Sequence, residues 1–132
     1  MVEVKGVDHL VISVSDMAVS RQFYSGLMTF LGFELMSDGE NMVGWRNGVT
    51  RLWIAQADAQ GLKHPYRKGD PGFHHYAWQL DSRASVDALQ TWLKEHNVPI
   101  ADPAGEYYED YYAVFFLDPD GMKLEGMYYG KA

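Results

Sequence analysis

Two histidines occupy equivalent places in the two halves of this chain. His9 lies in the run Val7–Val14 and His75 in the run Phe73–Leu80, half the length of the 132-residue chain apart. Each run has the alternation typical of a strand and is followed by a helix-capping residue and an amphipathic stretch. A duplicated half that keeps a histidine predicts a pseudo-two-fold site for a metal or small molecule.

Strand alternation selects the histidines that share a face. Successive side chains of a strand point to opposite faces. Alternate apolar residues predict a face packed under a helix in each copy: Leu10, Ile12 and Val14 in the first, and Tyr76, Trp78 and Leu80 in the second. His9 and His75 then share the other face, whereas His74 has the helix-packed phase.

A glutamate near the C-terminus completes a candidate ligand set. In the predicted last strand Leu124 has the helix-packed phase, so Glu125 should share the face of the histidines. A carboxylate in an apolar strand is costly to bury unless it is paired or binds a metal. Two imidazoles and one carboxylate suit a divalent first-row metal and leave positions open for substrate. We therefore predict one divalent ion (Fe, Mn, Ni or Zn) bound by His9, His75 and Glu125. The alternative is that each histidine is a hydrogen-bonded structural residue.

The elements that position these residues repeat the order β-α-β-β-β twice. The pattern predicts strands over 7–15, 33–37, 41–46, 50–56, 73–80, 98–108, 111–118 and 122–129, and helices over 17–30 and 83–96. Asp16 and Asp81-Ser82 are the expected helix caps. We expect a single α+β domain over 1–132, with one module at about 5–57, a linker at about 58–71 and a second module at about 72–130.

Composition excludes several function classes. The chain has no cysteine, which excludes disulfides, thiolate metal sites and cysteine nucleophiles. No apolar run approaches the roughly 20 residues needed to span a membrane, so a cytoplasmic protein is expected. The net charge of −7 argues against nucleic acid and anionic membranes as partners, and favours neutral or cationic small molecules.

Motifs at both ends of the chain resemble one superfamily. The motifs are Asp8-His9, Asp16, Ser20, Phe23-Tyr24 and Leu31-Gly32-Phe33 in the first half, and His75-Tyr76-Ala77-Trp78 and Phe116–Glu125 in the second. They are similar to the vicinal-oxygen-chelate superfamily, which includes glyoxalase I, extradiol dioxygenases, fosfomycin-resistance thiol transferases and bleomycin-binding proteins. The resemblance implies paired βαβββ modules forming a U-shaped mixed-sheet barrel around a central cavity. It also implies that His9, His75 and Glu125 are metal ligands, and that the chain forms a homodimer.

Departures from the superfamily pattern separate its branches. The position matching Glu125 in the first half is Trp53, which cannot bind a metal. This difference disfavours the glyoxalase I and epimerase branches of the superfamily. Phe115 and the tract Glu106–Tyr108 stand where extradiol dioxygenases carry a tyrosine and a histidine. The stretch Gly105–Tyr112 is acidic and aromatic, which disfavours a phosphonate. Bleomycin-type binders favour such grooves but typically lack metal ligands.

Aromatic side chains are expected to wall the site. Trp53 and Phe73 share the face of the histidines by alternation, and Trp45 and Tyr129 are further candidates for substrate binding. The alternative is that these rings pack in the core. Glu125 itself, Tyr107, Tyr108 and Tyr111 are the candidates for moving a proton.

The sequence thus predicts a divalent-metal-dependent enzyme acting on a small molecule with vicinal oxygens, with the metal as Lewis acid. It would be a lyase, a thiol transferase or a dioxygenase of the superfamily. The alternative is a non-catalytic protein that sequesters an antibiotic in an acidic, tyrosine-rich groove.

Overall fold

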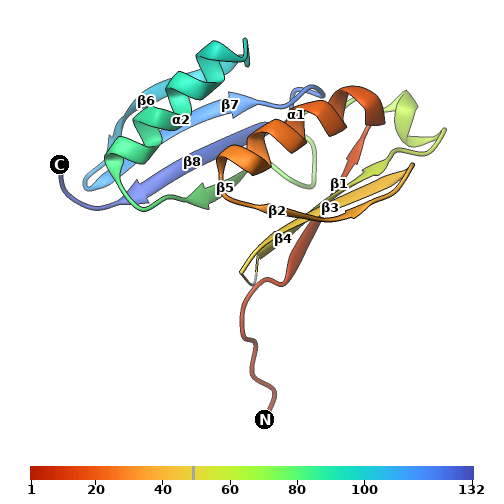
Figure 1. The fold of residues 1–132 in the computed structure, drawn as a ribbon, viewed down its shortest axis with the longest axis horizontal. Coiled ribbons are helices and arrows are strands. Elements are labelled where there is room, and N and C mark those ends of the chain that lie inside the picture. Colours follow the sequence, from red (N-terminus) through yellow and green to blue (C-terminus); the bar gives the residue numbers. More distant parts are fainter. Residues whose placement is uncertain (49) are drawn as a thin grey trace. The chain divides into compact units, whose positions relative to one another are not determined.

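The chain forms two compact units, Met1–Pro65 and Tyr66–Ala132. A computed structural model describes residues 1–48 and 50–132, and each unit is treated by itself (Figure 1). Within this described part, no helix is long and apolar enough to cross a membrane.

The first unit is a four-stranded sheet with one long helix. Its elements are β1 (His9–Val14), α1 (Met17–Phe30), β2 (Glu34–Asp38), β3 (Met42–Asn47), β4 (Thr50–Gln56) and the short 3-10 helix η1 (Gly61–Lys63). The strand order is β1-β4-β3-β2, with β1 parallel to β4 and the other pairs antiparallel.

The second unit repeats this plan. Its elements are β5 (Tyr76–Gln79), α2 (Arg83–Glu95), β6 (Ile100–Tyr108), β7 (Tyr111–Leu117) and β8 (Lys123–Tyr129). The strand order β5-β8-β7-β6 and the strand directions match those of the first unit. The predicted α+β fold of two tandem βαβββ modules is therefore confirmed. Each sheet is an open four-stranded sheet, and closure into a U-shaped barrel stays a prediction, as do the predicted domain bounds.

Both helices begin at the predicted caps. The Asp16 carboxylate accepts hydrogen bonds from the backbone amides of Ala18 and Val19 at 3.0 and 3.2 Å. The Ser82 hydroxyl accepts one from the Ser85 amide at 3.1 Å. These bonds satisfy amides that have no partner within the helix, so each helix can begin shortly after its strand: two residues separate β1 from α1, and three separate β5 from α2.

One face of each sheet packs against the helix of its own unit. In the second unit, α2 lies along the strands β6, β7 and β8 (Figure 1). Leu124 and Leu89 are fully buried there, and a Cβ at Gly126 would lie 2.4 Å from the Leu89 side chain. Only glycine allows α2 to approach β8 so closely. We call the opposite side of each sheet its helix-free face.

The strand β5 begins later than predicted. It starts at Tyr76 rather than at residue 73, because it pairs with β8, which starts at Lys123, and the ladder begins with Tyr76 opposite Leu124. His74 and His75 therefore lie in the segment that leads into the strand.

A side-chain-capped turn places β8. The Asp118 carboxylate is 4 % exposed and accepts hydrogen bonds from the amides of Asp120 at 2.9 Å and Met122 at 2.8 Å. Gly121 has a φ of 79°, which glycine adopts without a steric penalty. This turn ends β7 and starts β8, the strand that carries Glu125.

Candidate metal centre

Two of the three predicted ligands lie together in the second unit. His75 Nε2 lies 3.0 Å from Glu125 Oε1, and Glu125 is 2 % exposed. The register places Ala77 opposite Glu125, so His75, two residues earlier, has the same phase. His75 and Glu125 thus share the helix-free face of this sheet, as the alternation predicted.

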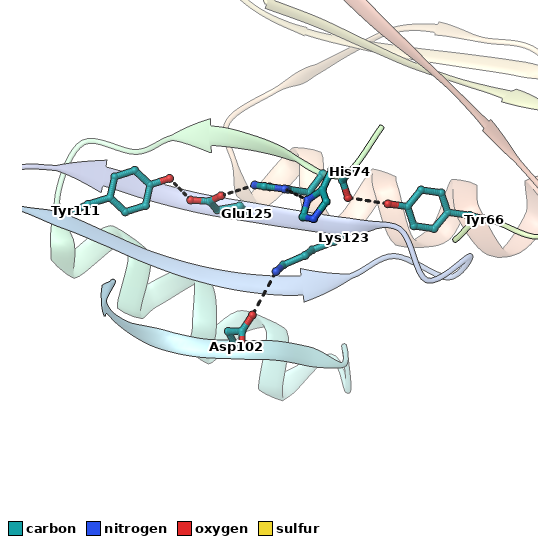
Figure 2. Close-up of polar contacts among 7 residues, drawn as sticks. Tyr66, His74, Asp102, Tyr111, Lys123 and Glu125 are labelled. Carbon is teal, nitrogen blue, oxygen red and sulfur yellow. Dashed lines mark hydrogen bonds and ion pairs between the residues drawn. The ribbon is translucent and has the colours of Figure 1, made fainter. Parts of the chain in front are cut away.

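Tyr111 holds the second oxygen of the buried carboxylate. Its hydroxyl donates to Glu125 Oε2, as the dashed line between these two side chains in Figure 2 shows, and His75 faces the other oxygen of Glu125. Burial, followed by this hydrogen bond, raises the pKa of Tyr111 above its ordinary value. Tyr111 is therefore a neutral hydrogen-bond donor that fixes the orientation of Glu125.

The two neighbouring histidines contact each other through their rings. His74 Nδ1 lies 2.7 Å from His75 Nδ1, and the rings meet edge to face. The Tyr66 hydroxyl donates to the His74 carbonyl at 2.7 Å, which fixes the backbone of this segment (Figure 2). Desolvation, and then the positive charges of His75, Lys68 and Lys123, lower the pKa of His74 and favour its neutral ring.

A lysine lies on the same face of β8, two residues before Glu125. Lys123 Nζ lies 3.4 Å from the Asp102 carboxylate and 4.4 Å from the centroid of the Phe115 ring. Phe115 is opposite Glu125 in the β7–β8 ladder. The helix-free face of the second unit therefore combines a histidine, a carboxylate, a phenol and an amine.

His9, the third predicted ligand, lies at the start of β1 in the first unit. Its Nδ1 is 2.7 Å from Asp8 Oδ2, and the other oxygen of Asp8 accepts a hydrogen bond of 2.7 Å from Arg51. The hydrogen bond from His9, together with the charge of Arg51, lowers the pKa of Asp8. Asp8 is thus an anionic acceptor for the His9 Nδ1–H, which directs Nε2 away from it.

The two registers establish which residues correspond between the units. Leu10 is opposite Leu52 in the first unit, as Tyr76 is opposite Leu124 in the second. Trp53 therefore corresponds to Glu125, as the sequence comparison of the halves predicted. A Cβ at Gly44 would lie 2.5 Å from the Trp53 ring, so this ring lies against the sheet on its helix-free face.

The structure places Trp45 in the core instead of in a substrate wall. Trp45 is opposite Leu52, so it has the helix-packed phase; it is 2 % exposed, and its ring lies 6.4 Å from that of Tyr24 in α1. The sequence contained the signal needed to predict this, because residues opposite each other in an antiparallel hairpin share a face, and Trp45 is opposite Leu52.

The other aromatic candidates lie at the surface of the second unit. Phe73 is 50 % exposed and contacts Tyr76. Tyr129 and Tyr108 both contact the Tyr111 ring, with centroids 5.1 and 5.6 Å away.

Tyr107 is not positioned like Tyr111. Its hydroxyl donates to the Pro103 carbonyl at 2.5 Å, and its ring contacts Phe115. Desolvation and the nearby Asp102 charge raise the pKa of Tyr107. Among the three tyrosines predicted to move a proton, Tyr111 is the one that contacts Glu125.

The acidic tract does not present Glu106 to the helix-free face. Glu106 forms an ion pair of 2.5 Å with Arg83 of α2, and Tyr112, its neighbour across the ladder, donates to Asp87 of α2 at 2.5 Å. The Glu106 charge is thus compensated on the helix side. The interpretation of this tract as unfavourable for an anionic phosphonate did not foresee the ion pair between Glu106 and Arg83.

The donor atoms of the second unit fit a divalent metal. An imidazole nitrogen and a buried carboxylate face each other at hydrogen-bond distance, and both types of atom bind Fe, Mn, Ni and Zn. Among the residues that the structure describes, no three histidine, cysteine, aspartate or glutamate side chains lie together as a group that could hold a metal.

Comparison with known proteins defines the class. The family described as the Glyoxalase/Bleomycin resistance protein/Dioxygenase superfamily matches residues 6–125, and the chain belongs to this superfamily. Among its relatives, the uncharacterized protein YaeR of Escherichia coli is 32% identical over 95% of this chain and 97% of that protein.

Two further relatives are more informative about fold and chemistry. The metallothiol transferase FosB of Staphylococcus epidermidis is 31% identical over 93% of this chain and 81% of that protein. A crystal structure of a glyoxalase-like protein from Bacillus halodurans is similar with a TM-score of 0.82 and 28% identity, covering 94% of this chain and 96% of that chain.

Proposed function

We propose that the protein is a divalent-metal-dependent enzyme acting on a small molecule with vicinal oxygens. The proposed ligands are His9, His75 and Glu125. The observation that carries the proposal is the buried Glu125 carboxylate facing His75 Nε2 on the helix-free face. A buried carboxylate in a strand is costly, and a cation between it and an imidazole offsets that cost.

The bound metal would act as a Lewis acid that polarises a substrate oxygen. The surrounding side chains position the ligands and the substrate. Tyr111 holds one oxygen of Glu125 and directs the other toward His75. We propose Trp53, Phe73 and Tyr129 as aromatic contacts for the substrate. Glu125 and Tyr111 are the candidates for holding a proton at the site, because Tyr111 donates to this carboxylate.

Thiol transfer is the reaction class to assay first. A relative that is 31% identical is named a metallothiol transferase. One placement removes an objection to an anionic substrate: the Glu106 charge is paired with Arg83 on the helix side. Lys123 lies on the face of Glu125, but the Asp102 carboxylate 3.4 Å away compensates its charge.

The decisive experiment is metal analysis of the purified protein after reconstitution with Fe²⁺, Mn²⁺, Ni²⁺ or Zn²⁺. We expect stoichiometric metal in the wild type and in His74→Ala, and its loss in His9→Ala, His75→Ala and Glu125→Ala. A wild type that binds none of these metals would overturn the enzyme proposal. Binding of a planar cationic antibiotic by that metal-free protein would instead support the sequestering function.

We also propose that the protein is a homodimer. Val11 and Met42 are 47 and 40 % exposed on the helix-free face of the first unit, and apolar side chains at this exposure favour burial against another surface. Sedimentation equilibrium should give twice the chain mass of 15.0 kDa, and the mass of one chain would contradict the proposal.

A further inference from the structure

We infer that the residue immediately before each ligand histidine is a positioning residue that fixes which ring nitrogen meets the metal. Asp8 does this for His9, and His74 does it for His75. In both pairs the preceding side chain contacts Nδ1, so that Nε2 is the nitrogen left for coordination. The inference rests on the proposed metal site and assigns a role to two residues outside the ligand set.

In the first unit, the direction of the hydrogen bond between His9 and Asp8 is fixed. The Asp8 carboxylate can only accept, so in the neutral His9 ring the proton lies on Nδ1 and the Nε2 lone pair is available to a metal. Arg51 holds the other oxygen of Asp8 at 2.7 Å and therefore fixes the orientation of the carboxylate. A carboxylate that accepts from the far nitrogen of a ligating imidazole orients the ring and increases its strength as a ligand.

In the second unit, the direction of the hydrogen bond between His74 and His75 can reverse. In a neutral His75 ring without a metal, the contact with the Glu125 carboxylate places the proton on Nε2, and Nδ1 then accepts a hydrogen bond from His74 Nδ1–H. When Nε2 is a ligand, the His75 proton lies on Nδ1, and His74 Nδ1 must accept. An imidazole serves both arrangements by changing its tautomer, which a carboxylate cannot do.

The surroundings of His74 suit this exchange. Its ring is exposed, so solvent can move the proton between its two nitrogens. Its backbone is held by the Tyr66 hydroxyl, which keeps the ring beside His75 while the proton moves. This assigns His74 a role that its phase in the strand pattern did not suggest.

The test measures metal affinity by competition with a chelator, using Co²⁺ and Zn²⁺ alone as probes. We expect Asp8→Ala and His74→Ala each to weaken binding by about 10- to 100-fold while the stoichiometry at saturation is unchanged. His74→Gln, whose side-chain amide can donate or accept, should recover much of the affinity.

Matched controls separate positioning from general effects of substitution. Asp38→Ala removes an aspartate that pairs with Arg21 at 2.7 Å in the same unit, and His64→Ala removes an exposed histidine. Both should bind metal like the wild type. Circular dichroism identifies any variant that fails to fold, and Asp8→Asn then replaces Asp8→Ala as the milder change.

A second readout needs no metal. Long-range ¹H–¹⁵N spectra of the metal-free protein should show the Nδ1–H tautomer at His9 and the Nε2–H tautomer at His75. The Asp8→Asn variant should lose the preference for the Nδ1–H tautomer at His9 and keep the Nε2–H tautomer at His75. Wild-type affinity in both Asp8→Ala and His74→Ala, with loss in His9→Ala and His75→Ala, would overturn the inference but leave the metal site standing. A wild type without metal affinity would overturn the proposed function itself.

Discussion

Two side chains compensate the burial of the Glu125 carboxylate, because each contacts one of its two oxygens. Tyr111 donates to one oxygen, and His75 faces the other at 3.0 Å. Loss of a single partner leaves a charged, buried acceptor without compensation, which costs more than the hydrogen bond contributes. The same residues are therefore expected to control both stability and metal affinity.

Replacing Tyr111 tests this dependence. Tyr111→Phe keeps the ring contacts and removes the donor, so we expect the free energy of unfolding to fall by about 1–3 kcal/mol. Urea denaturation measures the change. Tyr108→Phe is the matched control, because Tyr108 is 73 % exposed and lies in the same tract. Equal effects of the two variants would show that the Tyr111 hydroxyl does not stabilise Glu125.

Gly44 is expected to be required for the position of Trp53. A methyl group there would meet the Trp53 ring at 2.5 Å, so Gly44→Ala must displace the ring. We expect a loss of about 1–3 kcal/mol from overpacking, together with weaker binding of any ligand that contacts Trp53. Gly105→Ala is the control, since its nearest neighbour would be an oxygen at 3.9 Å. A Gly44→Ala protein with wild-type stability would contradict the placement of the ring.

At the scale of elements, the ion pair between Arg83 and Glu106 joins α2 to β6. Arg83 also donates to the Gly130 carbonyl at 2.9 Å, so it connects the helix to the chain beyond β8. The hydrogen bond from Arg83 lowers the pKa of Glu106 below the ordinary 4.5. The pair is thus charged and stabilising at neutral pH.

The lowered pKa predicts a pH dependence of known sign. The contribution of Glu106 is fully present above the ordinary pKa of 4.5, and is lost as the pH falls through the lower pKa of the folded state. The melting temperature of the wild type should therefore exceed that of Glu106→Gln at neutral pH, and the difference should shrink below pH 4.5. Glu109→Gln, in the adjacent turn, is the control. A difference between wild type and Glu106→Gln that grows on acidification would contradict the assignment.

Elements whose boundaries depend on local chemistry could be predicted from the sequence. Asp16 and Ser82 cap the helices as expected, and strict alternation put His75 and Glu125 on one face. Features that depend on how the strands pair were not predicted. The start of β5 is set by where β8 begins, which is a property of the sheet.

The side on which Glu106 lies also depends on pairing. The β6–β7 ladder has a register shift between Glu106 and Tyr108, so counting back from the turn assigns Glu106 to the wrong face. Such a bulge inserts one residue and reverses the alternation beyond it. The pair with Arg83 follows from this shift and was not readable from the pattern of residue types.

At the scale of the whole molecule, the two units repeat one fold but differ at one position of the candidate site. Both units keep a histidine whose Nδ1 is held by the preceding side chain, whereas Glu125 in one unit corresponds to Trp53 in the other. The proposed site therefore takes one ligand from the first unit and two from the second.

A metal that requires ligands from both units should stabilise the folded protein as a whole. At a free metal concentration of 100 times the dissociation constant, we expect a gain of about 2.7 kcal/mol in the free energy of unfolding. His9→Ala and Glu125→Ala should each abolish this gain, because each removes one ligand of the same ion, and His96→Ala is the control. Thermal unfolding with and without Zn²⁺ measures it. Retention of the gain in His9→Ala would show that His75 and Glu125 bind the ion without the first unit, and would remove His9 from the ligand set.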